Sequence, residues 1–233
     1  MNIDIVGWET LPDLRDVVVV IDVLRAFTTA AYAFGGGAKA IALVATVDEA
    51  VALRARFPAA LLVGEVGGYP IDGFDCGNSP FELTRRALGG AMVIQRTSSG
   101  TRAAVAAKGA RVLVAASFAC AEATVRYILR CQPAHVALVV SGRRGASGGG
   151  DDLACASYLA ARLLGEAVAS EPFLARVRDS DEARRFRDGD RIAFPAEDLD
   201  LALELDRFDF AMVARREGDL LLLEPTASPP QGG

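Results

Sequence analysis

The stretch VVVVIDVLRAFTT (residues 17–29) decides the fold that we expect for this chain. Its five β-branched residues in a row are typical of a strand buried on both faces of a sheet. The acidic residue Asp22 ends this apolar run, and a helix-like stretch follows at 27–34. A buried strand that leads directly into a helix is the repeating unit of an α/β fold.

The same alternation of apolar runs and helix-like stretches continues along the chain. Further apolar runs lie at 39–45, 61–63, 91–94, 111–116, 136–140, 192–194, 210–214 and 220–223. Helix-like stretches lie at 47–56, 80–88, 101–108, 119–130, 151–168 and 197–205. We therefore predict a three-layer α/β/α fold around a largely parallel, or mixed, sheet. The carboxyl ends of its strands should meet at one edge, where such sheets bind ligands.

The composition changes after the last long helix-like stretch. We expect residues 1–169 to form an α/β core that carries the active-site motifs. Residues 170–191 are charge-rich and read as an exposed helix plus a turn, so we expect 170–225 to form a C-terminal α/β layer packed on the core. Residues 226–233 are rich in Pro and Gly, which favours a disordered tail.

Composition narrows the classes of function. The net charge of −5 argues against a nucleic-acid partner, because backbone binding needs a clustered basic surface. The sequence has no apolar run of membrane-spanning length and no signal-peptide pattern at residues 1–4, so we expect a cytoplasmic protein without a membrane partner. The spacing of the four cysteines argues against a zinc site or a disulfide framework. A symmetric homodimer is compatible with a chain of this kind.

Acidic residues follow the apolar runs at positions suited to a divalent cation. Asp22 ends the first run, Glu65 stands between glycines after 61–63, and Asp151 and Asp152 open the helix-like stretch 151–168. Carboxylate oxygens are the preferred ligands of Mg²⁺, so these four residues are candidate metal ligands. Asp22, Glu65 and Asp152 are also candidate catalytic residues. The alternatives are a helix-capping role for Asp22, a water-facing turn for Glu65 and helix-dipole contacts for the Asp pair.

Arginine, amide and hydroxyl groups lie in neighbouring segments and suit an anionic substrate. The candidate binding residues are Arg25, Asn78, Ser98, Ser99, Gly100, Thr101 and Arg143. Arginine can hold a phosphate through two parallel hydrogen bonds, and a turn of hydroxyls at a helix start offers further donors. Arg25 could instead pair with Asp22, and Asn78 and the hydroxyl turn could serve only as helix caps. No P-loop pattern is present in the sequence.

Six segments in order resemble the 2-phosphosulfolactate phosphatase family. They are Asp22–Thr29, Gly64-Glu65, Gly73–Pro80, Arg96–Arg102, Ser141–Gly145 and Asp151–Cys155, with the strong motifs falling between about residues 15 and 160. The resemblance implies an α/β/α enzyme that requires Mg²⁺ and hydrolyses 2-phospho-3-sulfolactate, a step of coenzyme M biosynthesis. It also implies that the carboxylates named above are metal or catalytic residues and that Arg25, Arg143 and the hydroxyl turn bind anionic groups.

The chain departs from the usual family pattern at the anion-binding motifs. Val66 stands where many relatives have an arginine, so one positive charge is missing. Ser98 and Ser99 replace a Thr-Asn pair, and Asp151 replaces a glutamate. Two alternatives therefore remain open. One is an Mg²⁺-dependent phosphatase of another small phosphorylated hydroxyacid, and the other is a non-catalytic module that binds an anionic metabolite.

Overall fold

The computed structural model describes residues 1–8, 11, 15–142 and 150–226. The strands are β1 (Asn2–Gly7), β2 (Val17–Ile21), β3 (Ala40–Val44), β4 (Leu61–Val66), β5 (Tyr69–Pro70), β6 (Met92–Arg96), β7 (Val112–Ala116), β8 (His135–Val140), β9 (Ala211–Glu217) and β10 (Leu220–Thr226). The helices are α1 (Ala26–Gly35), α2 (Val47–Arg56), α3 (Pro80–Thr84), α4 (Gly100–Ala106), α5 (Ala121–Arg130), α6 (Gly150–Leu163), α7 (Glu171–Arg178), α8 (Asp181–Asp188) and α9 (Ala196–Ala202), with a 3-10 turn at Phe118–Cys120.

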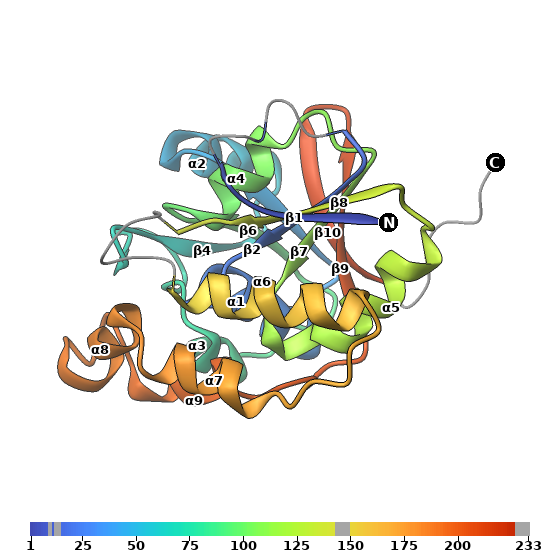
Figure 1. Cartoon of the computed structure of the whole chain (residues 1–233). Coiled ribbons are helices and arrows are strands. Elements are labelled where there is room, and N and C mark those ends of the chain that lie inside the picture. The colour runs from blue at the N-terminus through green and yellow to red at the C-terminus, as the bar shows by residue number, and fades with distance from the viewer. Residues whose placement is uncertain (9–10, 12–14, 143–149, 227–233) are drawn as a thin grey trace.

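Strand β2 is buried on both faces, and its side chains divide between two cores. Val18 and Val20 pack in the core that contains residues of α1 and α4. Val17, Val19 and Ile21 pack on the other face, in the core that contains residues of α5 and α6. Figure 1 shows α2 and α4 above the sheet and α5 and α6 below it. The predicted three-layer α/β/α fold is confirmed.

The sheet is mixed, because an antiparallel hairpin separates two parallel groups of strands. The strand order is β1-β8-β2-β7-β9-β10-β3-β6-β4-β5. Strands β1, β8, β2 and β7 are parallel, as are β3, β6 and β4. Each pairing from β7 through β9 and β10 to β3 is antiparallel, so the two groups run in opposite senses across the hairpin.

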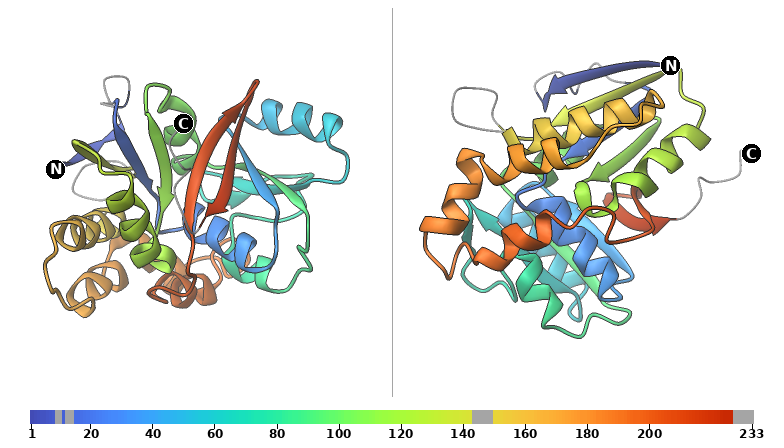
Figure 2. Two further views of the ribbon diagram at one scale, coloured as in Figure 1. Left: turned by 90° about the vertical axis from the view of Figure 1, so that its right-hand side faces the viewer. Right: turned by 60° about the horizontal axis from the view of Figure 1, so that its bottom comes forward.

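The twist of the sheet brings the carboxyl ends of the two groups back together. Neighbouring strands are rotated by about 20–25°, so the five steps from β2 to β6 add up to roughly 100–125°. Figure 2 shows how strongly the strands fan out from one edge of the sheet to the other. Asp22 after β2 and Gly100 after β6 are consequently within hydrogen-bond distance, at 2.9 Å.

The segment after residue 170 contributes three helices to one side of the molecule and a hairpin to the sheet. Helices α7, α8 and α9 lie along the lower side of the molecule, on the side of α6 (Figure 1). The hairpin β9–β10 occupies the middle of the sheet, between β7 and β3. Leu174 and Val177 of α7 and Phe186 of α8 share one hydrophobic core with β2 and α6. The residues beyond 170 are therefore continuous with the core of the first part of the chain.

Some local predictions differ from the structure. The apolar run 192–194 forms a turn and no strand, because Ile192 is exposed while Ala193 and Phe194 are buried against α8 and its neighbours. The charge-rich stretch 170–191 forms two helices in place of one. Strand β1 was not predicted. Residues 227–233, expected to be a tail, lie outside the described residues. No helix within the described ranges is both long and apolar enough to span a bilayer.

Candidate active site

Asp22 lies at the carboxyl end of β2 and is buried. Its Oδ1 accepts a hydrogen bond from the N–H of Ala26, the first residue of α1, at 2.9 Å, although the N-cap position of this helix is Arg25. Its Oδ2 accepts hydrogen bonds from the Gly100 N–H at 2.9 Å and from the Ser141 hydroxyl at 3.0 Å. Burial raises the pKa of Asp22 although these three donors lower it, and the charge of Glu65 adds to the rise.

Asp151 and Asp152 open α6 and face the same strand end. Asp152 accepts hydrogen bonds from the Val23 N–H at 2.8 Å and the Gly142 N–H at 2.9 Å, while Asp151 accepts one from the Leu24 N–H at 3.1 Å. Burial, followed by the charges of Glu182 and Asp22, raises the pKa of Asp151 to about 7. Burial and the neighbouring Asp151 and Asp22 likewise raise the pKa of Asp152 well above its usual value.

The Ser141 hydroxyl connects Asp22 with the acidic pair of α6. Its Oγ lies 3.0 Å from Asp22 Oδ2 and 3.2 Å from Asp152 Oδ2. A hydroxyl carries one proton, so it can donate to only one of these two carboxylates at a time. Asp22, Asp151 and Asp152 therefore form one buried acidic cluster. In this cluster the negative charge of each carboxylate makes ionisation of the other two less favourable. A bound cation or a shared proton relieves this repulsion.

Glu65 is buried near the end of β4 and is fixed by donors from two turns. Its Oε1 accepts a hydrogen bond from the Ser98 N–H at 2.5 Å. Its Oε2 accepts from the Gly68 N–H at 2.6 Å and from the Ser98 hydroxyl at 3.0 Å. The Ser98 hydroxyl also accepts a bond from the Gly67 N–H at 2.9 Å. Glu65 thus does not face bulk water, and Ser98 holds it in place.

The turn 97–101 is shaped by its own hydroxyls. Thr101 Oγ1 accepts a hydrogen bond from the Thr97 N–H at 2.8 Å, and Thr97 Oγ1 accepts one from the Thr101 N–H at 3.0 Å. A Cβ atom on Gly100 would lie 2.7 Å from Asp22 Oδ2, so glycine is required for the close approach of this turn to Asp22. Thr101 therefore shapes the turn, and Gly100 supports Asp22.

The Arg25 side chain is buried and pairs with a carboxylate that the sequence did not indicate. Its Nη1 donates to Asp198 Oδ2 at 2.8 Å, and not to Asp22. Further bonds reach the backbone carbonyls of Ala193 and Gly68, at 2.8 and 3.0 Å. The guanidinium also lies against the rings of Phe186 and Phe194. Arg25 therefore ties the strand end of the core to the segment that contains α8 and α9.

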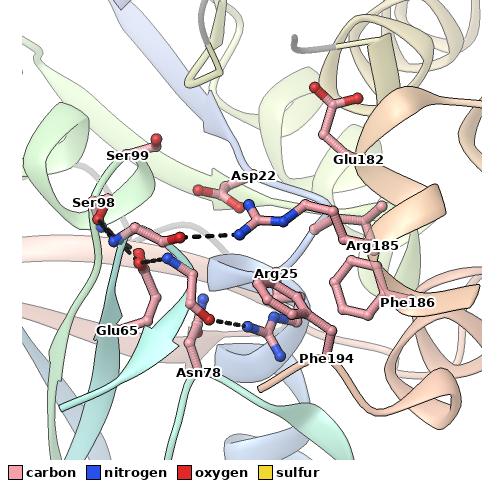
Figure 3. Close-up of a pocket in the computed structure, with 13 residues that line it drawn as sticks. Asp22, Arg25, Glu65, Asn78, Ser98, Ser99, Glu182, Arg185, Phe186 and Phe194 are labelled. Atoms are coloured by element: carbon pink, nitrogen blue, oxygen red, sulfur yellow. Dashed lines mark hydrogen bonds between the residues drawn. The ribbon is translucent and has the colours of Figure 1, made fainter. Parts of the chain in front are cut away.

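A pocket of about 240 Å³ opens above these groups (Figure 3). It is lined by Asp22, Leu24, Arg25, Glu65, Gly67, Gly68, Asn78, Ser98, Ser99, Glu182, Arg185, Phe186 and Phe194. Six of the residues predicted from the sequence therefore share one cavity: Asp22, Arg25, Glu65, Asn78, Ser98 and Ser99. Gly100 and Asp152 do not line the cavity: Gly100 donates a hydrogen bond to Asp22, and Asp152 accepts one from the Ser141 hydroxyl, which also contacts Asp22. Arg143 lies outside the described residues.

The helix α8 and Phe194 supply pocket residues that sequence reasoning missed. Glu182, Arg185 and Phe186 belong to a segment that reads as a solvated, charge-rich helix, so no local pattern marks them. Val66, where many relatives have arginine, is half exposed and does not line this pocket. Within the described part of the chain, no three His, Cys, Asp or Glu side chains are grouped closely enough to hold a metal ion as they stand.

The sequence of the chain matches a family model and several known proteins. A family model described as 2-phosphosulpholactate phosphatase matches residues 7–217. A probable 2-phosphosulfolactate phosphatase of Bacillus subtilis is 34% identical over 210 residues, which cover 90% of this chain and 91% of the relative. Proteins with the same description from Synechococcus sp. and Deinococcus radiodurans are 41% and 42% identical, over 71% and 67% of this chain and 71% and 66% of their own lengths. These matches confirm the resemblance seen in the motifs and the enzyme class that it implied, a phosphoric monoester hydrolase. The chain belongs to the 2-phosphosulfolactate phosphatase family.

Proposed function

We propose that this protein hydrolyses the phosphate monoester of 2-phospho-3-sulfolactate to 3-sulfolactate and phosphate, as in coenzyme M biosynthesis. The family and the names of the relatives support this substrate. The observation that carries the proposal is the pocket itself, in which Asp22 and Glu65 lie beside Ser98, Ser99 and two arginines. Carboxylates for chemistry and donors for an oxyanion are the groups that hydrolysis of a phosphate ester requires.

We further propose that the enzyme uses Mg²⁺ and that Asp22, Glu65, Asp151 and Asp152 hold it. The fit rests on the donor set, because hard carboxylate oxygens suit Mg²⁺ and a divalent charge would offset the repulsion within the buried acidic cluster. Ion binding would replace some of the hydrogen bonds that these oxygens now accept. When bound, the ion would neutralise charge on the phosphate oxygens.

Asp22 is the residue that we expect to act on the phosphate group. Either its carboxylate oxygen attacks phosphorus while the bond to the substrate alkoxide breaks, and water then cleaves the resulting aspartyl-phosphate to release phosphate, or Asp22 accepts a proton from a water molecule that attacks phosphorus. In both routes the leaving alkoxide must take up a proton. Water can supply this proton, and Asp152 acts through the Ser141 hydroxyl, which lies 3.0 Å from Asp22 and 3.2 Å from Asp152, to hold Asp22 in place.

Substrate preference is the first test of this function. With Mg²⁺ present, we expect kcat/KM for 2-phosphosulfolactate to exceed that for 2-phospholactate by at least about tenfold, because the sulfonate adds a charge-assisted hydrogen bond. Phosphate release at several substrate concentrations gives this ratio. Equal rates would assign the enzyme to another phosphorylated hydroxyacid. Release from neither compound would contradict the proposed reaction.

A further inference from the structure

Helix α8 closes one side of the pocket and carries one of its cations. Glu182, Arg185 and Phe186 of this helix line the cavity together with residues that follow β2, β4 and β6. The helix is held by Phe186, which is buried and packs edge-on against Phe194. Residues about 120 positions apart in the sequence therefore face one another across the pocket (Figure 3).

The two arginines that line the pocket differ in whether a neighbouring carboxylate neutralises their charge. Among the described residues that line it, the cations are Arg25 and Arg185. Arg25 is neutralised by the buried carboxylate of Asp198. No carboxylate of the described residues forms an ion pair with Arg185, whose Nη2 donates to the Gly67 carbonyl at 3.0 Å. Of these two arginines, Arg185 is therefore the one whose charge no carboxylate of the described residues neutralises.

Two contacts orient the guanidinium of Arg185, whose side chain is exposed. The group lies over the ring of Phe194, with 4.1 Å between its central carbon and the ring centroid. Arginine stacks flat on aromatic rings, which leaves the N–H groups at its edge free to donate. The guanidinium has five N–H donors, and the bond to Gly67 uses one of them. In Figure 3 the side chain extends from α8 toward the turn that follows Glu65.

We propose that Arg185 binds the second anionic group of the substrate, the sulfonate or carboxylate that accompanies the phosphate. This inference rests on the proposed function, since it assumes a phosphorylated acid in the pocket. The carboxylates of Asp22 and Glu65 would repel such a group, so it must lie toward a cation.

Three substrates with one carbon skeleton test this role. They are 2-phosphosulfolactate, 2-phospholactate and isopropyl phosphate, which carry two, one and no acidic groups besides the phosphate. We expect Arg185→Gln to raise KM about 10- to 100-fold for the substrate whose acidic group it binds, with kcat changed little. The KM of isopropyl phosphate should stay the same. A rise for 2-phospholactate identifies the carboxylate, and a rise for 2-phosphosulfolactate alone identifies the sulfonate.

The neighbouring arginine provides the matched control. Arg184 is on the same helix and is exposed, pairs with Asp181 and does not line the pocket. Arg184→Gln removes the same charge and should leave all three KM values unchanged. Arg185→Lys, which keeps the charge but loses the fork of donors, should recover part of the lost affinity. Equal KM changes for all three substrates in Arg185→Gln would overturn the proposal, because they would show a general effect on the pocket.

Binding of the product separates this proposal from the proposed reaction. Isothermal titration calorimetry with 3-sulfolactate measures binding in the absence of turnover. We expect the dissociation constant to rise about 10- to 100-fold in Arg185→Gln and to stay the same in Arg184→Gln. This result would support the role of Arg185 even if the wild-type enzyme released no phosphate. Equal affinity of wild type and Arg185→Gln, or no binding to either, would overturn it.

Discussion

Replacement of Asp22 by asparagine is expected to lower kcat by roughly 10³-fold or more. The substitution preserves the shape of the side chain, and an amide oxygen can still accept the bond from the Ala26 N–H. It removes the negative charge on which both routes for Asp22 depend. Initial rates of phosphate release in the variant and in the wild type measure the effect. Turnover of Asp22→Asn at near the wild-type rate would exclude both roles.

Two controls test whether a loss of activity in Asp22→Asn comes from the missing charge at this site. Asp219 is exposed and pairs with Arg56 on the surface, so Asp219→Asn should keep full activity. Circular dichroism and thermal unfolding of Asp22→Asn should match those of the wild type and exclude misfolding. Incubation with a phosphate mimic and mass analysis of the peptide that contains Asp22 then separates the two routes. A modified Asp22 indicates a covalent aspartyl intermediate, and an unmodified one indicates attack by water.

The second large effect is expected for the ion pair between Arg25 and Asp198. Both side chains are almost completely buried, and Asp198 also accepts bonds from the Ser79 hydroxyl at 2.7 Å and the Phe81 N–H at 2.9 Å. Burial raises the pKa of Asp198 although Arg25 lowers it. Asp198→Ala leaves the Arg25 guanidinium buried without a counter-charge, so the free energy of unfolding should fall by about 3–5 kcal/mol.

Urea denaturation followed by circular dichroism measures this loss. Asp219→Ala is the matched control, because it breaks an ion pair whose two side chains are both exposed and should leave the urea midpoint unchanged. An equal, small effect of both substitutions would show that the buried pair does not hold α9 against α3 and the start of α1.

The fold could be predicted from the sequence where a pattern depends on local burial. The apolar run at 17–21 predicts a strand between two layers of helices, and β2 is buried on both faces. The hairpin β9–β10 in the middle of the sheet could not be predicted, because strand order depends on packing between segments far apart in the chain. β1 was missed because, as a sheet-edge strand, it is only partly buried and its apolar pattern is weak.

Some residues of the site could be predicted from their neighbours in the sequence, and others could not. Asp22, Glu65 and Ser98 could be found because they stand in polar motifs that follow apolar runs of the sequence, at or near the ends of β2, β4 and β6. Asp198 and Arg185 carry no such signal, since each stands in a helix whose pattern of charges is typical of a solvent-exposed surface. Their roles arise only when α8 and α9 pack over the strand ends. The alternative pairing of Arg25 with Asp22 is wrong, because Arg25 pairs with Asp198, while its contact with a ligand stays a prediction for a residue that lines the pocket.

The central claim is that the acidic cluster around Asp22 supports Mg²⁺-dependent hydrolysis of a phosphate monoester. The most direct test is the initial rate of phosphate release from 2-phosphosulfolactate by the purified wild-type protein. The rate is measured with Mg²⁺, with EDTA, and again after excess Mg²⁺ is restored. We predict rapid release with Mg²⁺, loss of release with EDTA, and recovery when the ion returns. Release that EDTA leaves unchanged, or no release with Mg²⁺, would contradict the claim.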